Sequence, residues 1–570
     1  MFQVYKTSAQ YVDQGGGKRK GSTVFYLELW HADIEAFVEM RNLGGPEAKR
    51  CRELFNAVWI CDEFMRRVRS DGDWSLFCPS EAKGLSDVWG KEFDELYRKY
   101  EATPGLARKV IKARKLWGAI YDAHTSNGTP YCMSKDACNA KSNEQHRGTI
   151  KSSNLCAEVV EYSDETETGV CNLASMCLPK YVENGTFNYE KFILWVQHAI
   201  KCLNRVLDRG WLPLEECRKY NFNMRSIGLG TQGTSDTFFK LRVPAEIQNP
   251  QRPGFYMLNP ECATIDRRIW ETMYYAACDM SCRLAERDGY YPKFPGSPMS
   301  KGLFQFDLWN RKPEEGRHDW HGLRERILKF GLRNSQLLAQ MPTASTSSIR
   351  GNTESIEFPK SLIAYRKTLA GDFYVPCTYL MEMLVERGLW NEELKNKIII
   401  RGGSIQGIDE VPLDIQELFR TAWEISTKTM MDLSIGRGPF CCMSQSLNWT
   451  MANIDFEKWN SAMFYAFDHG LKTWSYYVHN KASLDAIPVT LDPDWVEAEE
   501  QKKQKHAAAA KRARDEGSTI APATIHLPTQ QDVLKRAKQT QEPTAQAEEE
   551  LTEAQICRRD NPGACTSCGT

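Results

Sequence analysis

Apolar residues recur along this chain at two spacings, one typical of helices and one typical of strands. The longest helical pattern covers residues 189–208, where apolar side chains return every three or four positions for more than four turns: Phe192, Trp195, Val196, Ala199, Ile200, Leu203 and Val206. Short apolar runs such as residues 23–27 alternate with helical patterns along the chain. This alternation predicts an α/β fold.

Two shorter helical patterns have recognisable ends. Asp33 stands at an N-cap position before an apolar face formed by Ile34, Phe37 and Val38, so we expect a helix directly after the first strand. A second pattern ends at Asn127-Gly128 and places four apolar residues on one face: Val110, Ala113, Trp117 and Ile120.

Length and composition exclude several classes of protein. With 570 residues, the chain is long enough for one very large catalytic domain or a few smaller ones. Its net charge of -1 gives no electrostatic footprint for nucleic acid or an anionic membrane, so we expect neither as a partner. The chain has nineteen cysteines without a repeating frame and no secretory signal pattern, so we expect free thiols in a reducing compartment. Because it also has no long apolar run that could span a membrane, we expect a cytoplasmic location.

Two glycine-rich segments suggest contact with phosphate. Residues 13–21 combine a triple glycine with basic residues, and such a loop can present backbone N–H groups and cations to a phosphate; the alternative is a solvated turn. Residues 228–233 match the dinucleotide fingerprint G-x-G-x-x-G. The preceding residues 220–227 are polar and do not predict a buried strand, so we interpret these glycines as a tight turn packed against another element.

A hydroxyl-rich segment follows a short apolar run. Residues 337–341 predict a buried strand, and five of the next seven residues, 342–348, are Ser or Thr. Backbone N–H groups and hydroxyls where a strand gives way to a helix can bind an anion. A plain Ser/Thr-rich loop is the alternative.

Cysteine and carboxylate residues lie together in an apolar stretch. A segment of six residues contains Ser153, Asn154, Cys156 and Glu158. A second cysteine, Cys171, follows fifteen residues after Cys156. A thiol can be oxidised and a nearby carboxylate can act as a general base, a combination suited to redox chemistry on an alcohol. The alternative is that both cysteines are small apolar core residues.

The last third of the chain adds a tyrosine pair and a tail. Adjacent Tyr476 and Tyr477 stand near the end of the last regular pattern, where such a pair usually has a structural role. From about residue 493 the composition is that of a disordered tail. The tail ends in a CxxC dithiol, Cys565 and Cys568; a zinc site that also uses Cys557 and His526 is the alternative.

These motifs, taken in order, resemble the large, catalytic subunit of a class I ribonucleotide reductase. The resemblance rests on residues 13–21, 154–158, 171–175, 342–346, 354–357, 444–448, 476–477 and the terminal cysteine pair. It implies a ten-stranded α/β barrel with Cys156 on a central finger loop. It also implies reduction of ribonucleoside diphosphates to deoxyribonucleotides, the precursors of DNA.

The resemblance assigns a role to each site residue. Cys156 would become a thiyl radical, Glu158 would take a proton from the ribose, and Asn154 and Ser153 would contact the substrate. Tyr476 and Tyr477 would relay the radical from a small subunit with a di-iron tyrosyl centre. The diphosphate would bind a cradle formed by Pro342, Thr343, Ala344, Ser345 and Thr346.

Regulation and re-reduction are also implied. ATP, dATP, dGTP or dTTP would act through an effector loop formed by Asp13, Gln14, Gly15, Gly16, Lys18 and Arg19. Cys171 would be half of a reducible disulfide. Cys565 and Cys568 would reduce it and be restored by thioredoxin or glutaredoxin. The family further implies a dimer of large subunits; we expect no metal and no covalently bound cofactor in this chain.

Two features depart from the family pattern. The family forms its reducible disulfide from two cysteines, and only one of them has a counterpart in this chain, Cys171. The N-terminal regulatory cone and the first part of the specificity site also have no counterpart. We therefore expect an N-terminally truncated barrel over residues 1–490 and a flexible tail over 491–570. The alternative function is a non-catalytic derivative that binds nucleotide or the small subunit, but retention of the radical and dithiol residues favours the enzyme.

Overall fold

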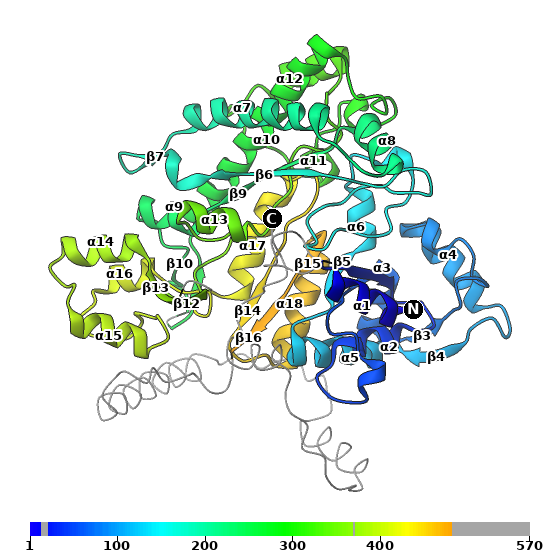
Figure 1. Cartoon of the computed structure of the whole chain (residues 1–570), viewed down its shortest axis with the longest axis horizontal. Helices are drawn as coiled ribbons and strands as arrows, with labels where there is room; N and C mark the ends of the chain where they lie inside the picture. The colour runs from blue at the N-terminus through cyan, green and yellow to red at the C-terminus, as the bar shows by residue number, and fades with distance from the viewer. Residues whose placement is uncertain (13–20, 253, 369–370, 482–570) are drawn as a thin grey trace, which may run out of the picture.

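The computed structural model describes residues 1–12, 21–252, 254–368 and 371–481 (Figure 1). The predicted effector loop, from Asp13 to Arg19, lies outside the described residues. So does the predicted tail with Cys557, Cys565, Cys568 and His526.

One group of strands lies near the N-terminus in the fold. Parallel strands β1 (Val24–Glu28), β2 (Phe55–Ile60) and β5 (Tyr131–Ser134) pair in that order. Strand β15 (Thr473–Ser475) then pairs with β5 in the antiparallel direction. The end of the described chain thus closes onto strands near its beginning.

A second group continues from β15. After Tyr476-Tyr477 the chain forms β16 (Val478–Asn480), which is parallel to β14 (Trp449–Met451). Single bridges then connect Gln445 to Gln340 and Leu338 to Leu229 of β9 (Ile227–Gln232). Strand β9 is parallel to β6 (Asn172–Cys177).

These pairings join eight extended segments of the described chain into one series. Three run in one direction (β1, β2, β5), and five run in the other (473–480, 443–451, 337–341, β9, β6). The mixed α/β architecture is confirmed, and closure into a barrel of ten strands stays a prediction. No helix within the described ranges is long and apolar enough to cross a membrane.

Helices cover the outside of both groups. In Figure 1, α7 and α10 lie near β6 and β9, with α12 beyond them at the top, whereas α2, α3 and α5 lie near the N-terminus, on the side of β5. The helices in chain order are α1 (Phe2–Tyr11), α2 (Ile34–Val38), α3 (Asp62–Ser70), α4 (Gly90–Glu101), α5 (Ala113–Asn127), α6 (Lys135–Ala140), α7 (Tyr189–Arg209), α8 (Glu215–Met224), α9 (Thr234–Leu241), α10 (Pro260–Asp288), α11 (Gln305–Leu308), α12 (Trp320–Phe330), α13 (Ala344–Arg350), α14 (Thr378–Glu386), α15 (Glu392–Ile400), α16 (Leu413–Leu418), α17 (Thr427–Arg437) and α18 (Phe456–Asp468).

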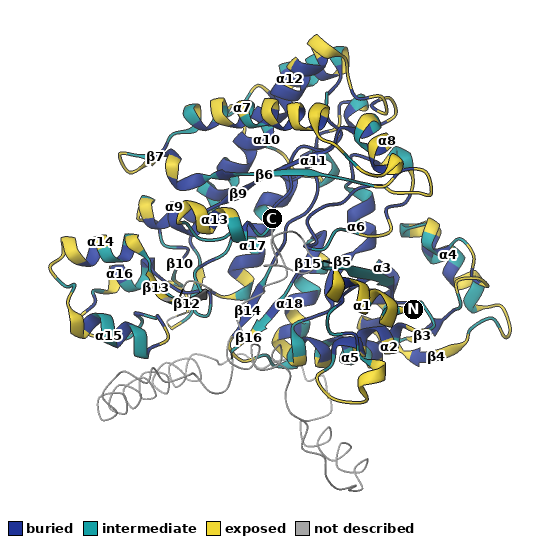
Figure 2. Ribbon diagram, in the orientation of Figure 1, coloured by how far each residue is buried: buried dark blue, intermediate teal, exposed yellow. Residues whose placement is uncertain are grey.

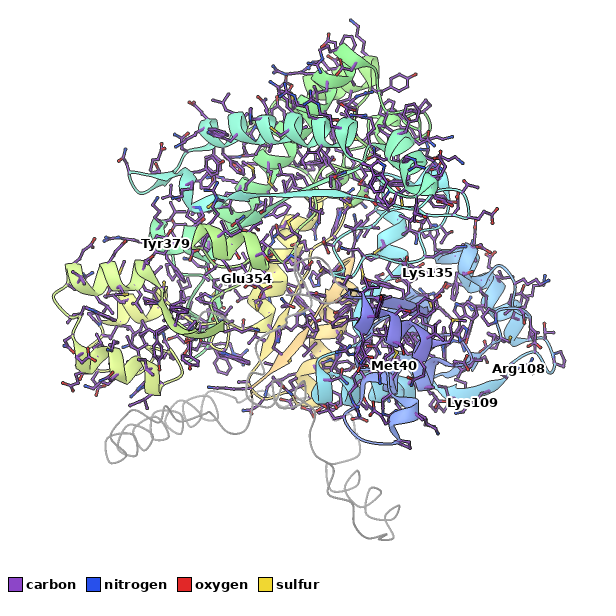
Figure 3. All side chains as sticks on the ribbon, in the orientation of Figure 1. Met40, Arg108, Lys109, Lys135, Glu354 and Tyr379 are labelled. Carbon is purple, nitrogen blue, oxygen red and sulfur yellow. The ribbon has the colours of Figure 1, made fainter. Side chains whose placement is uncertain are left out.

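Short hairpins and ion pairs connect these layers. The remaining strands are β3 (Asp73–Leu76), β4 (Lys109–Lys112), β7 (Val182–Glu183), β8 (Thr186–Phe187), β10 (Glu246–Gln248), β11 (Tyr256–Leu258), β12 (Ile363–Thr368) and β13 (Gly371–Pro376). Lys135, labelled in Figure 3, is buried at the start of α6 and lies 2.8 Å from the Glu28 carboxylate. This pair connects the ends of β1 and β5.

The helical periodicities were good predictors of helix position. The pattern at 189–208 is α7, with Phe192, Val196, Ile200 and Leu203 buried, and the run at 23–27 is largely β1. The second helix ends as predicted, because Gly128 has the left-handed φ of 73°. The predicted start of this helix was wrong, because Val110 lies in β4. There the pairing with β3 overrides the local helical spacing.

The prediction of a tight turn at residues 228–233 was wrong. Residues 227–232 form β9, a fully buried strand, and the preceding residues form α8. A Cβ on Gly228 would lie 2.5 Å from Leu173 and 3.2 Å from the Cys171 sulfur, and one on Gly230 would lie 2.5 Å from the Ala339 carbonyl oxygen. The glycines therefore permit close packing of neighbouring strands, and packing against another element was correctly expected.

Candidate functional site

The segment from Ser153 to Glu158 lies between the two groups of strands. Cys156 and Ala157 belong to a buried cluster with side chains from both groups: Phe55, Ala57 and Trp59 of β2, Tyr131 and Met133 of β5, and Ala339, Met443 and Tyr476. Figure 2 shows that the ribbon in this central region is mostly buried. The candidate site is therefore an interior loop surrounded by strands.

The loop is stabilised first by its own residues. The side-chain oxygen of Asn154 accepts hydrogen bonds from the backbone N–H groups of Glu158 and Val159, both at 3.1 Å. Ala157 has a left-handed φ of 62°, which turns the chain sharply between Cys156 and Glu158. Because a residue with a Cβ disfavours this conformation, the surrounding contacts must hold the turn in place.

Strands from both groups supply those contacts. The Tyr26 hydroxyl of β1 donates to the Asn154 carbonyl oxygen at 2.9 Å. From the other group, the Thr473 hydroxyl donates to the Ala157 carbonyl oxygen at 2.7 Å, and the backbone N–H of Ser444 donates to the Glu158 carbonyl oxygen at 2.8 Å. The loop position is thus fixed by strands far apart in the sequence.

Glu158 is suited to proton transfer near neutral pH. Burial raises the pKa of its carboxyl group to about 7, although hydrogen bonds from Asn154 and Ser446 act in the opposite direction. The Ser446 hydroxyl lies 3.3 Å from its side-chain oxygen Oε2. At neutral pH this carboxyl group can therefore either accept or release a proton.

Cys171 lies half-buried at the start of β6, against Gly228 of β9. Burial raises the pKa of its thiol well above the usual value, and the nearby carboxyl groups of Glu161 and Glu158 raise it further. It packs against the same buried cluster as Cys156. The structure therefore brings together two of the predicted catalytic cysteines and the predicted carboxylate.

Tyr476 and Tyr477 border this cluster. Their ring centroids lie 4.5 Å apart, and the ring of Tyr131 lies 4.6 Å from Tyr476 and 5.1 Å from Tyr477. The backbone N–H of Tyr476 donates to Leu447 at 2.7 Å. The tyrosine pair therefore lies between β15 and β16, and its Tyr476 ring reaches the buried cluster that contains Cys156.

The hydroxyl-rich segment follows a buried run that pairs with other described residues only through single bridges at Leu338 and Gln340, and a helix begins after it as predicted. The extended run 337–341 ends at Pro342, Thr343 has a left-handed φ of 56°, and α13 begins at Ala344. The Thr343 hydroxyl accepts a hydrogen bond from the backbone N–H of Ser355 at 2.7 Å. Ala344 and Ser345 are half-buried and Thr346 is exposed, so the first turn of α13 is accessible.

Several contributors were missed by sequence reasoning. The hydroxyls of Ser446 and Thr473 donate hydrogen bonds to the loop backbone. Lys472, next to Thr473, donates from its ammonium group to the carbonyl oxygens of Cys442 at 2.6 Å and Met443 at 2.9 Å. Burial lowers the pKa of Lys472. Ser446 belongs to the motif 444–448, but no local signal indicated its contact with Cys156, 290 positions away.

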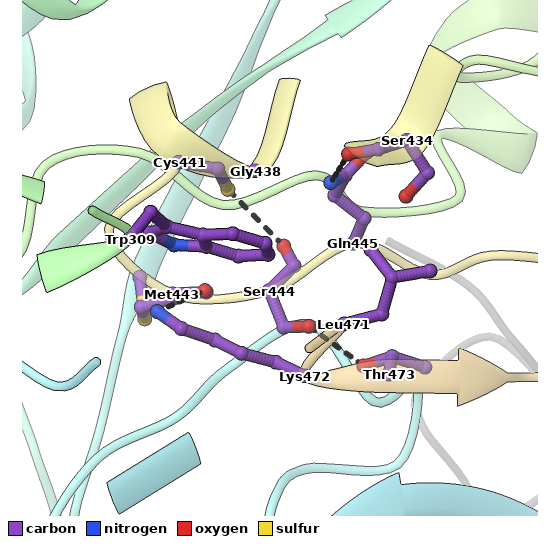
Figure 4. A pocket seen from close by; sticks show the side chains of 10 residues that line it. All are labelled: Trp309, Ser434, Gly438, Cys441, Met443, Ser444, Gln445, Leu471, Lys472 and Thr473. Carbon is purple, nitrogen blue, oxygen red and sulfur yellow. Dashed lines mark hydrogen bonds between the residues drawn. The ribbon is translucent and has the colours of Figure 1, made fainter. Parts of the chain in front are cut away.

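A small cavity of about 10 Å³ lies behind this strand (Figure 4). It is lined by Trp309, Ser434, Gly438, Cys441, Met443, Ser444, Gln445, Leu471, Lys472 and Thr473. This volume suits about one water molecule and no nucleotide. The described residues contain no group of three or more His, Cys, Asp or Glu side chains placed to hold a metal ion.

Comparison with known proteins decides the family. The family described as "Ribonucleotide reductase, barrel domain" matches residues 1–477. The chain belongs to this family. The ribonucleotide reductase barrel thus accounts for nearly all the residues that the structure describes.

Relatives of this barrel are named as large subunits. The chain is 46% identical over 505 residues to the ribonucleoside-diphosphate reductase large chain of Cryptosporidium parvum, covering 88% of this chain and 61% of that protein. It is 46% identical over 518 residues to the large subunit of Caenorhabditis elegans, covering 91% and 64%. The chain thus spans less than two thirds of the length of these relatives.

A solved structure supports the fold. The class Id ribonucleotide reductase alpha subunit of Actinobacillus ureae superposes with a TM-score of 0.58 at 20% identity, covering 81% of this chain and 71% of that one. At 20% sequence identity, this similarity supports a shared fold and nothing further.

Proposed function

We propose that this chain is the catalytic barrel of a ribonucleoside-diphosphate reductase and reduces ribonucleoside diphosphates to 2′-deoxyribonucleoside diphosphates through a thiyl radical. The observation that carries the proposal is that Cys156 stands on an interior loop, two residues before a buried carboxyl group with a pKa of about 7, in one cluster with Tyr476. The names of the relatives support the same reaction.

In the proposed reaction, the Cys156 radical removes the hydrogen atom from C3′ of the ribose. Glu158 takes the proton of the 3′-hydroxyl group, and the 2′-hydroxyl group leaves as water. Cys171 and a second thiol supply two electrons and form a disulfide, and Cys156 returns the hydrogen atom to C3′. Asn154 and Ser153 contact the sugar.

Substrate binding is proposed at the accessible end of α13. The backbone N–H groups in the first turn of a helix have no partners within the helix and attract anions. Residues Pro342 to Thr346 would hold the diphosphate there. The eight observed segments would belong to a ten-stranded barrel whose open end admits the nucleotide, with residues 1–490 as the catalytic barrel.

The proposed partners follow from the family. A small subunit with a di-iron tyrosyl radical would oxidise Cys156 through Tyr477 and Tyr476. Nucleoside triphosphates would act at the loop from Asp13 to Arg19. The tail, residues 491–570, would reduce the Cys171 disulfide with Cys565 and Cys568, and thioredoxin or glutaredoxin would restore it. We further propose a dimer of large subunits in the cytoplasm.

The test is the variant Cys156→Ser in the complete large subunit, assembled with its small subunit. We expect deoxynucleotide formation to be abolished, because serine forms no comparable radical, while binding of the nucleoside diphosphate is retained. Cys217→Ser, which changes a buried cysteine of α8 outside the cluster, is the control and should remain active. Normal turnover by Cys156→Ser would reject the radical assignment.

A further inference from the structure

Two buried carboxyl groups lie behind Cys171 and have no role in the proposed reaction. Glu144 makes three hydrogen bonds: one side-chain oxygen accepts from the backbone N–H of Tyr162 at 2.8 Å, and the other accepts from the hydroxyls of Tyr220 at 2.9 Å and Ser335 at 3.1 Å. These contacts connect three separate segments, so a structural role explains Glu144.

Glu161 has different surroundings. Its side-chain oxygen Oε1 accepts a hydrogen bond from the Ser226 hydroxyl, which also lies 4.0 Å from the Cys171 sulfur. The Ser226 hydroxyl thus bridges the Glu161 carboxyl group and the Cys171 sulfur. The carboxyl group, hydroxyl and thiol therefore form one contiguous group.

Two glycines make room for this group. A Cβ on Gly169 would lie 3.0 Å from oxygen Oε2 of Glu161, and a Cβ on Gly228 would lie 3.2 Å from the Cys171 sulfur. Ser226 is fully buried and Glu161 is nearly so. The backbone thus permits close approach of a carboxyl group to a sulfur atom that the proposed function oxidises and reduces.

The electrostatic environment keeps a proton on Glu161. Burial, and next the neighbouring Glu144, raise the pKa of Glu161 to about 8, and Glu158 contributes in the same direction. The hydrogen bond from Ser226 acts against this rise. At neutral pH Glu161 is therefore mostly protonated, and Cys171, whose pKa is also raised, is unfavourable as a thiolate.

We propose that Glu161 donates a proton to the sulfur of Cys171 when its disulfide is reduced and accepts that proton when the disulfide forms. This inference rests on the proposed function and assigns a further residue to it. A leaving thiolate in a buried site needs a proton donor within hydrogen-bond reach, directly or through one hydroxyl group, and Glu161 reaches the Cys171 sulfur through the Ser226 hydroxyl.

Reduction of the disulfide takes two electrons and two protons from an external dithiol. A thiolate of an external dithiol attacks the second sulfur of the disulfide, the S–S bond breaks, and its electron pair stays on the Cys171 sulfur. The Ser226 hydroxyl gives its proton to that sulfur and takes the proton of Glu161 in its place. The other thiolate of the reductant then attacks the mixed disulfide and releases the second thiolate. The two protons lost by the reductant restore Glu161 and protonate this second thiolate.

The experiment compares one turnover with many. The complete large subunit is reduced in advance, freed of reductant and mixed with the small subunit and substrate, and the burst of deoxynucleotide is measured. The steady-state rate is then measured with dithiothreitol. For Glu161→Gln we expect a burst amplitude within about two-fold of wild type and a steady-state rate at least about ten-fold lower.

Two further variants make the result decisive. Glu271→Gln changes another buried carboxyl group, which accepts from the backbone N–H of Glu314 at 3.0 Å in the α10 region, and should leave both measurements unchanged. Ser226→Ala removes the hydroxyl between Glu161 and Cys171 and should lower only the steady-state rate. If Glu161→Gln does not fold, this second variant decides the question.

Each remaining outcome counts against one proposal. A normal steady-state rate in Glu161→Gln, or in Ser226→Ala, overturns the proton-transfer role. Loss of the burst in folded Glu161→Gln overturns it as well, because the residue would then act in the substrate step. Absence of a burst in the wild type rejects the proposed function itself.

Discussion

The side-chain hydroxyl of Ser446 donates a hydrogen bond to the backbone carbonyl oxygen of Cys156 over 2.6 Å. The same hydroxyl lies 3.3 Å from the carboxyl group of Glu158. One buried side chain on a strand therefore contacts the backbone of the proposed radical residue and the carboxyl group of the proposed base. The relative position of these two residues depends on that strand as well as on the loop itself.

The variant Ser446→Ala tests this dependence. It leaves a buried carbonyl oxygen without its donor, so we expect the free energy of unfolding to fall by about 1–3 kcal/mol. The rate of deoxynucleotide formation should fall more than the affinity for substrate, because the loop loses its alignment. Denaturant unfolding and steady-state kinetics measure the two effects.

Thr103→Ala is the matched control for Ser446→Ala. Its hydroxyl makes a comparable hydrogen bond to the carbonyl oxygen of Lys99 at 2.9 Å, but at an exposed position. We expect a change within about 0.5 kcal/mol and unaltered kinetics. Equal effects of the two substitutions would contradict a special role for Ser446.

The pKa of Glu158 predicts how the reaction depends on pH. Burial raises this pKa to about 7, and a base must be ionised to accept a proton. The rate of the chemical step should therefore rise with pH, reach half its maximum near pH 7 and fall at lower pH. Glu158→Gln should abolish this step at every pH. A rate independent of pH between 6 and 8, with chemistry limiting, would contradict the assignment.

The same shift predicts a change in stability. The pKa of Glu158 in the folded protein lies above the unfolded value of 4.5, so the folded state binds the proton more tightly. Stability therefore decreases as pH rises through this window. Relative to wild type, Glu158→Gln should gain up to about 3 kcal/mol between pH 4 and pH 8. Urea unfolding at both pH values measures this gain, and a constant difference would exclude it.

Local sequence patterns predicted the elements that depend on local interactions. The periodicity at 189–208 and the Gly128 stop of α5 were sufficient, because amphipathic faces and left-handed C-caps are set within one helix. Likewise, the change from the run 337–341 to α13 followed from apolar residues succeeded by hydroxyl-bearing ones.

The errors concern residues whose environment comes from distant segments. Gly228 matches a nucleotide fingerprint by spacing, but the reason for glycine there is the approach of Cys171 and Ala339 from neighbouring strands. Similarly, Val110 fits a helical face but pairs with Ser75. The contact between Ser446 and Cys156 required the fold, whereas Cys156 and Glu158 were recognisable from the family resemblance.

Tyr476 and Tyr477 can be tested by removing their hydroxyl groups. Phenylalanine preserves the ring contacts but has no O–H hydrogen to transfer, so Tyr476→Phe and Tyr477→Phe should each abolish deoxynucleotide formation. Binding of the small subunit, measured by calorimetry, should not change. Tyr181→Phe removes the hydroxyl of another buried tyrosine, beside Phe187 and Phe192, and should keep full activity. Normal activity in either relay variant would contradict the proposed route.

The Gly228→Ala substitution tests whether close strand packing positions Cys171. The added methyl group would lie 2.5 Å from Leu173, 3.1 Å from Ala339 and 3.2 Å from the Cys171 sulfur, so at least one neighbour must move. We expect a loss of about 1–3 kcal/mol in unfolding free energy from overpacking, together with slower turnover.

Gly436→Ala in α17 is the matched control, because its methyl group meets no atom within 4 Å. That variant should be unchanged or gain up to about 1 kcal/mol from its higher helix propensity. Equal stability of the two variants would show that the interior tolerates a side chain at residue 228, and that the glycine there has a reason other than packing.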